Sequence, residues 1–154
     1  MEPTKQYTVT EITVAYHNKQ KARERPVVSS SSDAFHLLLK GYDPDLIGLQ
    51  EMFVVMYLNV SNRVLGVYKT ATGGLTGTVA DIRLILSVGL KVAATSIIVS
   101  HNHPSGNLKP SRLDEELTRK LSEAAKMIDL KLLDHLIVEP AGTEYYSFAD
   151  EGIL

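Results

Sequence analysis

Three short apolar segments constrain the fold of this chain more than any other feature. The segment Phe53–Leu58 is apolar at every position, Ile97–Val99 is aliphatic, and Leu130–Val138 is largely so. A nearly continuous apolar run of this length is typical of a strand that is buried on both faces. Stretches with helical spacing of apolar residues lie between these strands. The chain is therefore predicted to be α/β (α+β), with a mixed β-sheet and helices packed on both sides of it.

Further strands are expected on either side of this framework. Tyr7–Tyr16, rich in threonine and β-branched residues, is predicted to be a strand, and His17–Val28 a polar, basic loop. Val64–Thr70 follows the tight turn at residues 61–63 and forms a hairpin with the first apolar segment. A last strand is expected over Glu144–Phe148.

Three helices are predicted from capping residues and apolar spacing. The first begins with Ser31 or Ser32 as the N-cap and has Gly41 just beyond its end. The second covers 79–92 after Thr78, and the third runs to about Met127. Their expected buried faces are Ile82, Ile85, Leu86 and Leu90 in the second helix, and Leu113, Leu117, Leu121, Ala124 and Ile128 in the third.

Composition narrows the possible functions. The 154 residues suit one domain, and the absence of cysteine excludes disulfides, thiolate nucleophiles and cysteine-based zinc sites. With 16 basic and 18 acidic residues, the net charge of −2 provides no strong attraction for nucleic acid or an anionic membrane. No apolar run approaches a membrane span, and the N-terminus lacks signal-peptide features, so a cytoplasmic location is expected.

The segment 101–114 carries the most chemistry. His101 and His103 lie two residues apart at the end of a predicted strand, so their side chains project to the same side. The loop after them leads to Ser111 and Asp114 at the start of the next helix. Two imidazoles and one carboxylate would leave one position of a zinc ion open for water, as in catalytic zinc sites.

Structural interpretations of the same residues remain open. Ser111 and Asp114 also match a capping box, and a His-x-His pair alone is a weak indication of metal binding. Glu51, read without further information, is a charged residue at a strand boundary. Asn102 and Ser105 fit either turn chemistry or support of the site, and His135 fits a hydrogen-bonded structural histidine or a residue that orients a ligand.

The spacing His-x-His, seven residues, then Ser-x-x-Asp resembles the JAMM (MPN+ or JAB) motif of metal-dependent isopeptidases. The wider segments His101–Gly106, Pro110-Ser111 and Leu133–His135 resemble the bacterial RadC-like branch of that superfamily. The resemblance extends from about Glu51 to Leu154. It implies a JAB/MPN-like domain with the layered architecture of cytidine deaminases, with residues 1–50 packed as part of the same domain.

The resemblance also implies a set of roles. His101, His103 and Asp114 would bind one zinc ion per chain, and Glu51 would act as general base and then acid. Ser111 would donate a hydrogen bond to the developing oxyanion. The implied activity is hydrolysis of an amide or isopeptide bond in a peptide or protein substrate by a metal-activated water.

Two alternatives to hydrolysis are kept. RadC-like proteins are associated with DNA repair, which would give an accessory protein that acts on or near nucleic acid. Larger members carry a helix-hairpin-helix region for this, and nothing in residues 1–50 matches it. The basic cluster Lys19–Arg25 is the only feature that favours such a partner, and a solvated loop or an edge strand protected by charge explains it better. The other alternative is a binding domain without turnover.

Overall fold

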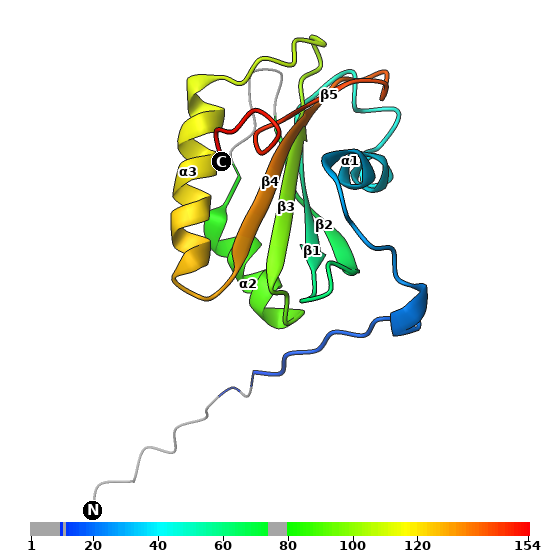
Figure 1. Ribbon diagram of the computed structural model, residues 1–154, viewed down its shortest axis with the longest axis vertical. Coiled ribbons are helices and arrows are strands. Elements are labelled where there is room, and N and C mark those ends of the chain that lie inside the picture. The colour runs from blue at the N-terminus through cyan, green and yellow to red at the C-terminus, as the bar shows by residue number, and fades with distance from the viewer. Residues whose placement is uncertain (1–9, 11, 74–79) are drawn as a thin grey trace, which may run out of the picture.

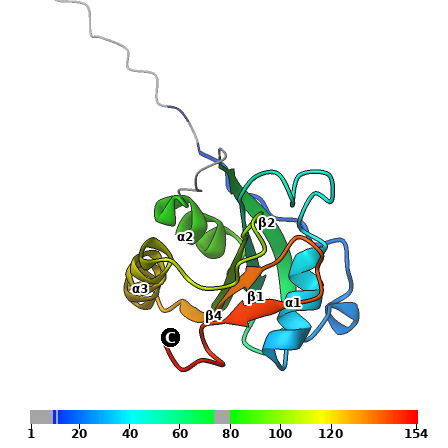
Figure 2. The ribbon, with the colours of Figure 1, turned by 90° about the horizontal axis from the view of Figure 1, so that it is seen from above.

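A mixed five-stranded sheet forms the centre of the computed structural model, which describes residues 10, 12–73 and 80–154 (Figure 1). The strand order is β2-β1-β3-β4-β5, with β3 and β4 parallel and the other neighbours antiparallel. Helix α1 covers one face, and α2 and α3 cover the other (Figure 2). The bounds are α1 Ser31–Leu39, β1 Met52–Leu58, β2 Val64–Thr72, α2 Ile82–Lys91, β3 Ser96–Asn102, α3 Arg112–Lys126, β4 Lys131–Val138 and β5 Tyr145–Ser147.

Strand β1 separates two apolar layers. All seven of its residues are buried, which confirms the prediction of a strand enclosed on both faces. Val54, Met56 and Leu58 belong to the layer under α1, whereas Phe53, Val55 and Tyr57 belong to the layer under α2 and α3. The predicted hairpin is also present, because β1 pairs with β2. Within the described ranges, no helix is long and apolar enough to cross a membrane.

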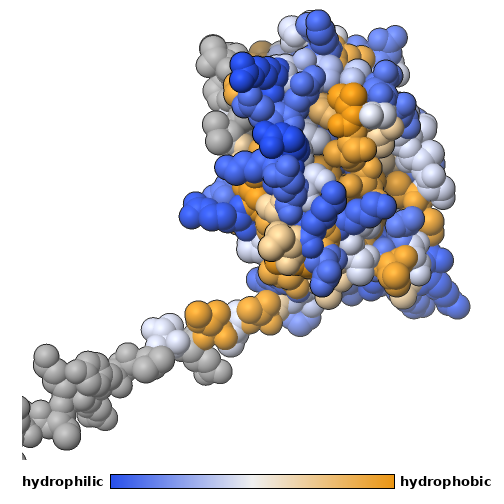
Figure 3. All heavy atoms as spheres, turned by 60° about the vertical axis from the view of Figure 1, so that its left-hand side comes forward, coloured by the Kyte–Doolittle hydropathy of each residue, from blue (hydrophilic) through white to orange (hydrophobic). Residues whose placement is uncertain are grey.

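The beginning of the chain does not follow the prediction. The described part of the expected strand Tyr7–Tyr16, which is residues 10 and 12–16, is not in a strand, and the remainder lies outside the described residues. Ile12 and Val14 are 86% and 68% exposed on an extended segment that leaves the body of the protein (Figure 3). A β-type pattern forms a strand only where a neighbouring strand provides hydrogen-bond partners. The segment His17–Val28 is a loop with one turn of 3-10 helix at Ala22–Glu24.

Two apolar positions predicted to be buried are exposed. Leu90 and Leu113 are 61% and 75% exposed. In α2, it is Gly89 that faces the sheet, where a Cβ would lie 2.9 Å from Leu130 Cδ2, and Leu90 therefore points outward. In α3 the buried positions begin at Thr118, more than a turn after Leu113.

Helix starts were predicted less accurately than helices. The N-cap of α1 is Ser30, whose hydroxyl accepts from the Asp33 amide, rather than Ser31 or Ser32. Helix α2 begins at Ile82, because the Asp81 carboxylate accepts from the Arg83 amide and caps it. The predicted cap Thr78 lies outside the described residues.

Gly41 follows the last residues of α1 as predicted, but for a different reason. Its φ angle is not in the left-handed region. A Cβ there would lie 2.9 Å from Val54 Cγ1 and 3.0 Å from Val67 Cγ1. Valine side chains are stiff, so this contact cannot relax by rotation. The end of α1 therefore approaches the sheet as closely as it does because residue 41 has no side chain.

The substitution Gly41→Ala tests this close approach. We expect it to lower the free energy of unfolding by about 1–3 kcal/mol, the usual cost of overpacking a core. Gly66→Ala is the matched control, because a Cβ at Gly66 in β2 would meet nothing within 4 Å. Urea denaturation of both variants measures the difference. Equal stabilities of the two would contradict the packing explanation.

Candidate metal centre

Strand β3 delivers two histidine rings to one point. His101 is the second-last residue of β3 and His103 follows the strand. Their Nε2 atoms lie 2.9 Å apart, as the two-residue spacing predicted. Phe53 of the neighbouring strand stacks on the His101 ring, with the ring planes 7° apart. Asn102, between them, points to the opposite face of the sheet.

Asp114 comes to the same point from the first turn of α3. Its Oδ1 lies 3.2 Å from His101 Nε2, and its Oδ2 lies 3.6 Å from His103 Nε2. The carboxylate also accepts from the Ser111 amide at 2.7 Å, while the Asp114 amide donates to the Ser111 hydroxyl. The capping box and the histidine cluster predicted for these residues are therefore both present, and they share one carboxylate.

This group of side chains can hold a metal ion. Tetrahedral ligands about 2.0–2.1 Å from zinc lie about 3.3 Å from one another. The two Nε2 atoms lie 2.9 Å apart, and each has one oxygen of the Asp114 carboxylate at 3.2 or 3.6 Å. Ligand atoms taken one from each residue all lie within 4.8 Å of one another, so small shifts would bring them to one ion. His103 Nδ1 meets the main-chain oxygen of Asn107 at 2.5 Å, and an oxygen of this kind can only accept. Nδ1 of His103 therefore carries the proton, and Nε2 has a free lone pair for a metal.

Charges at the site favour the ionised carboxylate. Burial opposes ionisation of Asp114, but hydrogen bonds with His101 and His103 outweigh it and hold the pKa of Asp114 well below its usual range. The same hydrogen bond to Asp114 raises the pKa of His103, and the charge of Glu51 adds to that increase. A metal ion would therefore bind to a carboxylate that is already ionised, and it would compete with protons for Nε2 of His103.

Glu51 lies half-buried, one residue before β1. Its influence on His103 indicates that it is close to the histidine pair. Asn102 fixes the loop that ends at Glu51: its amide nitrogen donates to the oxygens of Ile47 and Gln50. Its Oδ1 accepts from the Met52 amide at 2.6 Å. Asn102 is thus a buried residue that holds this loop, and its support of a metal site stays a prediction.

Ser105 and Ser111 have different surroundings. Ser105 is exposed, and its hydroxyl accepts from the Asn107 amide at 3.3 Å, which is turn chemistry. Ser111 is the N-cap of α3, and its hydroxyl accepts from the Asp114 amide. The structure thus assigns Ser111 a capping contact, and its role toward an oxyanion stays a prediction.

His135 of β4 contacts a metal-ligand candidate directly. Its Nε2 lies 2.8 Å from His101 Nδ1, and its Nδ1 lies 2.6 Å from the Thr118 hydroxyl. His135 is therefore a buried, hydrogen-bonded histidine beside a candidate ligand, and its role in orienting that ligand stays a prediction. Burial lowers the pKa of His135 well below its usual range, so the ring is neutral. Sequence analysis missed Thr118, although it lies one helical turn after Asp114 on the same side of α3.

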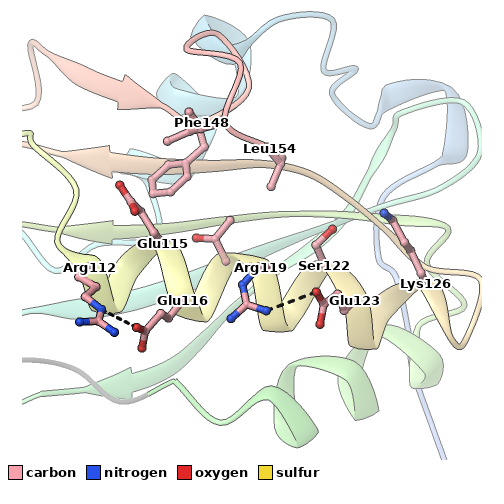
Figure 4. Close-up of a pocket in the computed structure, with 11 residues that line it drawn as sticks. Arg112, Glu115, Glu116, Arg119, Ser122, Glu123, Lys126, Phe148 and Leu154 are labelled. Carbon is pink, nitrogen blue, oxygen red and sulfur yellow. Dashed lines mark hydrogen bonds and ion pairs between the residues drawn. The ribbon is translucent and has the colours of Figure 1, made fainter.

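A groove of about 550 Å³ lies between α3 and the C-terminal segment of the chain. Its walls are the charged side of α3, including the pairs Arg112–Glu116 and Arg119–Glu123, and the C-terminal residues Phe148 and Leu154 (Figure 4). Figure 3 turns this side of the molecule forward and shows hydrophilic side chains beside a hydrophobic strip. The candidate metal ligands do not line the groove, but two of its lining residues, Thr118 and Phe148, contact His135.

Fold and site together define an α/β domain with a candidate His-His-Asp metal centre between a strand end and a helix start. Residues 28–153 match the RadC-like JAB domain family, and the chain belongs to that family. This confirms the resemblance inferred from the motifs, and the mixed sheet covered on both faces is consistent with a JAB/MPN fold.

Curated relatives share this region of sequence. A UPF0758 protein of Flavobacterium johnsoniae is 44% identical over 128 residues, which cover 82% of this chain and 53% of the relative. One from Porphyromonas gingivalis is 36% identical over 155 residues, covering 100% of this chain and 67% of the relative. One from Streptococcus gordonii is 46% identical over 102 residues, which cover 66% of this chain and 44% of the relative. The chain spans about half the length of most of these relatives.

The role of Asn102 can be tested by Asn102→Ala. The substitution leaves the Met52 amide and two main-chain oxygens without their buried partner, and each such loss costs about 1–3 kcal/mol. We expect a clear loss of stability in thermal unfolding. Ser105→Ala, in the exposed part of the same segment, is the control and should unfold at nearly the parent temperature. An unchanged Asn102→Ala protein would show that the loop before Glu51 is held by other contacts.

Proposed function

We propose that this protein is a zinc-dependent hydrolase of the JAMM type that cleaves amide or isopeptide bonds in peptides or proteins. The observation that carries the proposal is the convergence of His101, His103 and Asp114 within coordinating distance of one another. Membership of the RadC-like JAB family supports it. One zinc ion per chain is the expected cofactor.

The open side of the site suits a reaction. The side chains of His103 and Asp114 are 14% and 16% exposed, whereas that of His101 is 4% exposed. Solvent and substrate therefore approach from the side of His103 and Asp114. A zinc ion held there would supply Lewis-acid polarisation and a lowered pKa of water. Glu51, whose charge acts on His103, would take a proton from the attacking water and return it to the leaving nitrogen.

The nucleic-acid alternative gains no support from the described residues. In the Lys19–Arg25 segment, the main-chain oxygens of Arg23 and Arg25 accept from the Arg63 guanidinium, and Lys21 pairs with Glu24. The Arg63 contacts hold the loop against the residue that precedes β2, and the Lys21–Glu24 pair lies within the loop. A DNA partner, a binding domain without turnover, and a cytoplasmic location all stay predictions, and hydrolysis is the function proposed.

The substitution Glu51→Gln tests the general base. It should slow cleavage in a peptide and isopeptide screen by about 10²–10⁴-fold, because an amide cannot take the proton. Zinc content by elemental analysis, measured on untagged protein, should stay at one ion per chain. Asp114→Ala is the comparison and should lose zinc as well as activity. A parent chain that takes up no zinc, or a fully active Glu51→Gln variant, would overturn the assignment.

Ser111 requires a test that separates capping from catalysis. Ser111→Ala should lose about 1 kcal/mol of stability through the cap. If its hydroxyl also meets the oxyanion, turnover should fall by about 10²–10³-fold with zinc retained. Ser30→Ala removes an equivalent cap from α1, away from the site, and should cost similar stability with turnover unchanged. Equal turnover in the two variants would limit Ser111 to capping.

A further inference from the structure

Three groups behind the candidate metal centre form a continuous chain of hydrogen bonds. The Thr118 hydroxyl donates to the main-chain oxygen of Asp114 at 2.6 Å. The same hydroxyl meets His135 Nδ1 at 2.6 Å, and His135 Nε2 meets His101 Nδ1 at 2.8 Å. All three side chains are buried, so water does not compete for these positions.

The polarity of this chain is fixed at one end. A main-chain oxygen can only accept, so the single Thr118 proton is directed to Asp114. The Thr118 oxygen must then accept from His135 Nδ1–H. The second nitrogen of the neutral His135 ring is left as an acceptor, and it takes the proton on His101 Nδ1. A neutral His101 ring then has its lone pair on Nε2, where a metal ion would replace the contacts with Asp114 and His103.

The backbone of β4 is shaped so that His135 can occupy this place. The pairing of β3 with β4 shifts by one residue: Ile97 faces Leu132, whereas Ile98 faces Asp134. The additional residue, Leu133, packs in the layer under α1. Without this bulge, the alternation of side chains would turn residue 135 away from α3. Phe148 stacks on the His135 ring, with the ring centroids 4.7 Å apart, and this contact also limits the orientation of the ring.

We propose that Thr118 and His135 are positioning residues that hold His101 in the tautomer able to bind a metal ion through Nε2. The inference rests on the metal-binding part of the proposed function and not on hydrolysis. Asp114 then has two connections to the ion: its carboxylate as a ligand, and its main-chain oxygen as the end of the chain that orients His101.

Thr118→Val provides the main test, because valine has nearly the shape of threonine but no hydroxyl. Metal binding would then require a buried His135 N–H without an acceptor. Without a metal ion, the variant can avoid this cost, because His101 and His135 can both change tautomer. The effect therefore falls on affinity: we expect zinc and cobalt(II) to bind about 10–100-fold more weakly, in competition with a chromophoric chelator.

Two controls separate positioning from general damage. Thr118→Ser restores the hydroxyl and should bind both ions nearly as the parent does, although it loses a buried methyl group. Ser122→Ala removes a hydroxyl one turn further along α3 and should have parent affinity. Circular dichroism and thermal unfolding establish that each variant is folded, and the visible spectrum of bound cobalt(II) reports whether the ligand geometry is retained.

A second measurement does not depend on any variant. In the zinc-loaded parent, long-range proton–nitrogen correlation spectra should show His135 protonated at Nδ1 and not at Nε2; the opposite pattern overturns the inference even if Thr118→Val fails to fold. Parent-like affinity of a folded Thr118→Val variant, or an equal loss in Thr118→Ser, overturns this inference alone. A parent chain that binds neither metal overturns it together with the proposed function.

Discussion

The Asp114 carboxylate is the point at which helix α3 and strand β3 depend on each other. It accepts a hydrogen bond from the Ser111 amide at the start of α3, and it faces the Nε2 atoms of His101 and His103. Because the cap fixes its position on the first turn, the distance between ligand groups is set by how α3 packs on the sheet. Thr118, Leu121 and Ala125 provide that packing. A shift of α3 would therefore change helix capping and the candidate metal site together.

At the C-terminal end of β3, the two faces of the sheet carry different parts of the candidate site. On the face under α2 and α3, the rings of His101 and His135 lie beside Phe53, in the apolar layer that also contains Val99. On the face under α1, Asn102 binds the loop that leads to Glu51. At the end of β3, His101 is a candidate ligand on one face, and the next residue, Asn102, holds the loop of the predicted general base on the other face. The period-two alternation of a strand makes this possible within three residues.

Sequence was sufficient where a pattern is local, and insufficient where a distant partner decides. Continuous apolar runs identified β1 and β3, and the spacing of His101, His103 and Asp114 brought out a group that the fold does assemble. By contrast, residues 12–16 have the composition of a strand but no strand beside them. The outward position of Leu90 follows from the close contact of Gly89 with Leu130. The role of Thr118 depends on a one-residue bulge in β4, which no single-sequence pattern reveals.

The buried and exposed halves of the site have different physical requirements. The buried half contains imidazole nitrogens among apolar rings, where each polar atom needs a partner of the right polarity. Main-chain oxygens, which can only accept, meet this need: Asn107 does so for His103, and Asp114 does so for His101 through two side chains. The exposed side of the site, at His103 and Asp114, is reached by water, which can pair with polar atoms there. In the proposed hydrolase, substitutions there would therefore change substrate preference, while the buried hydrogen bonds would keep the proton positions that metal binding requires.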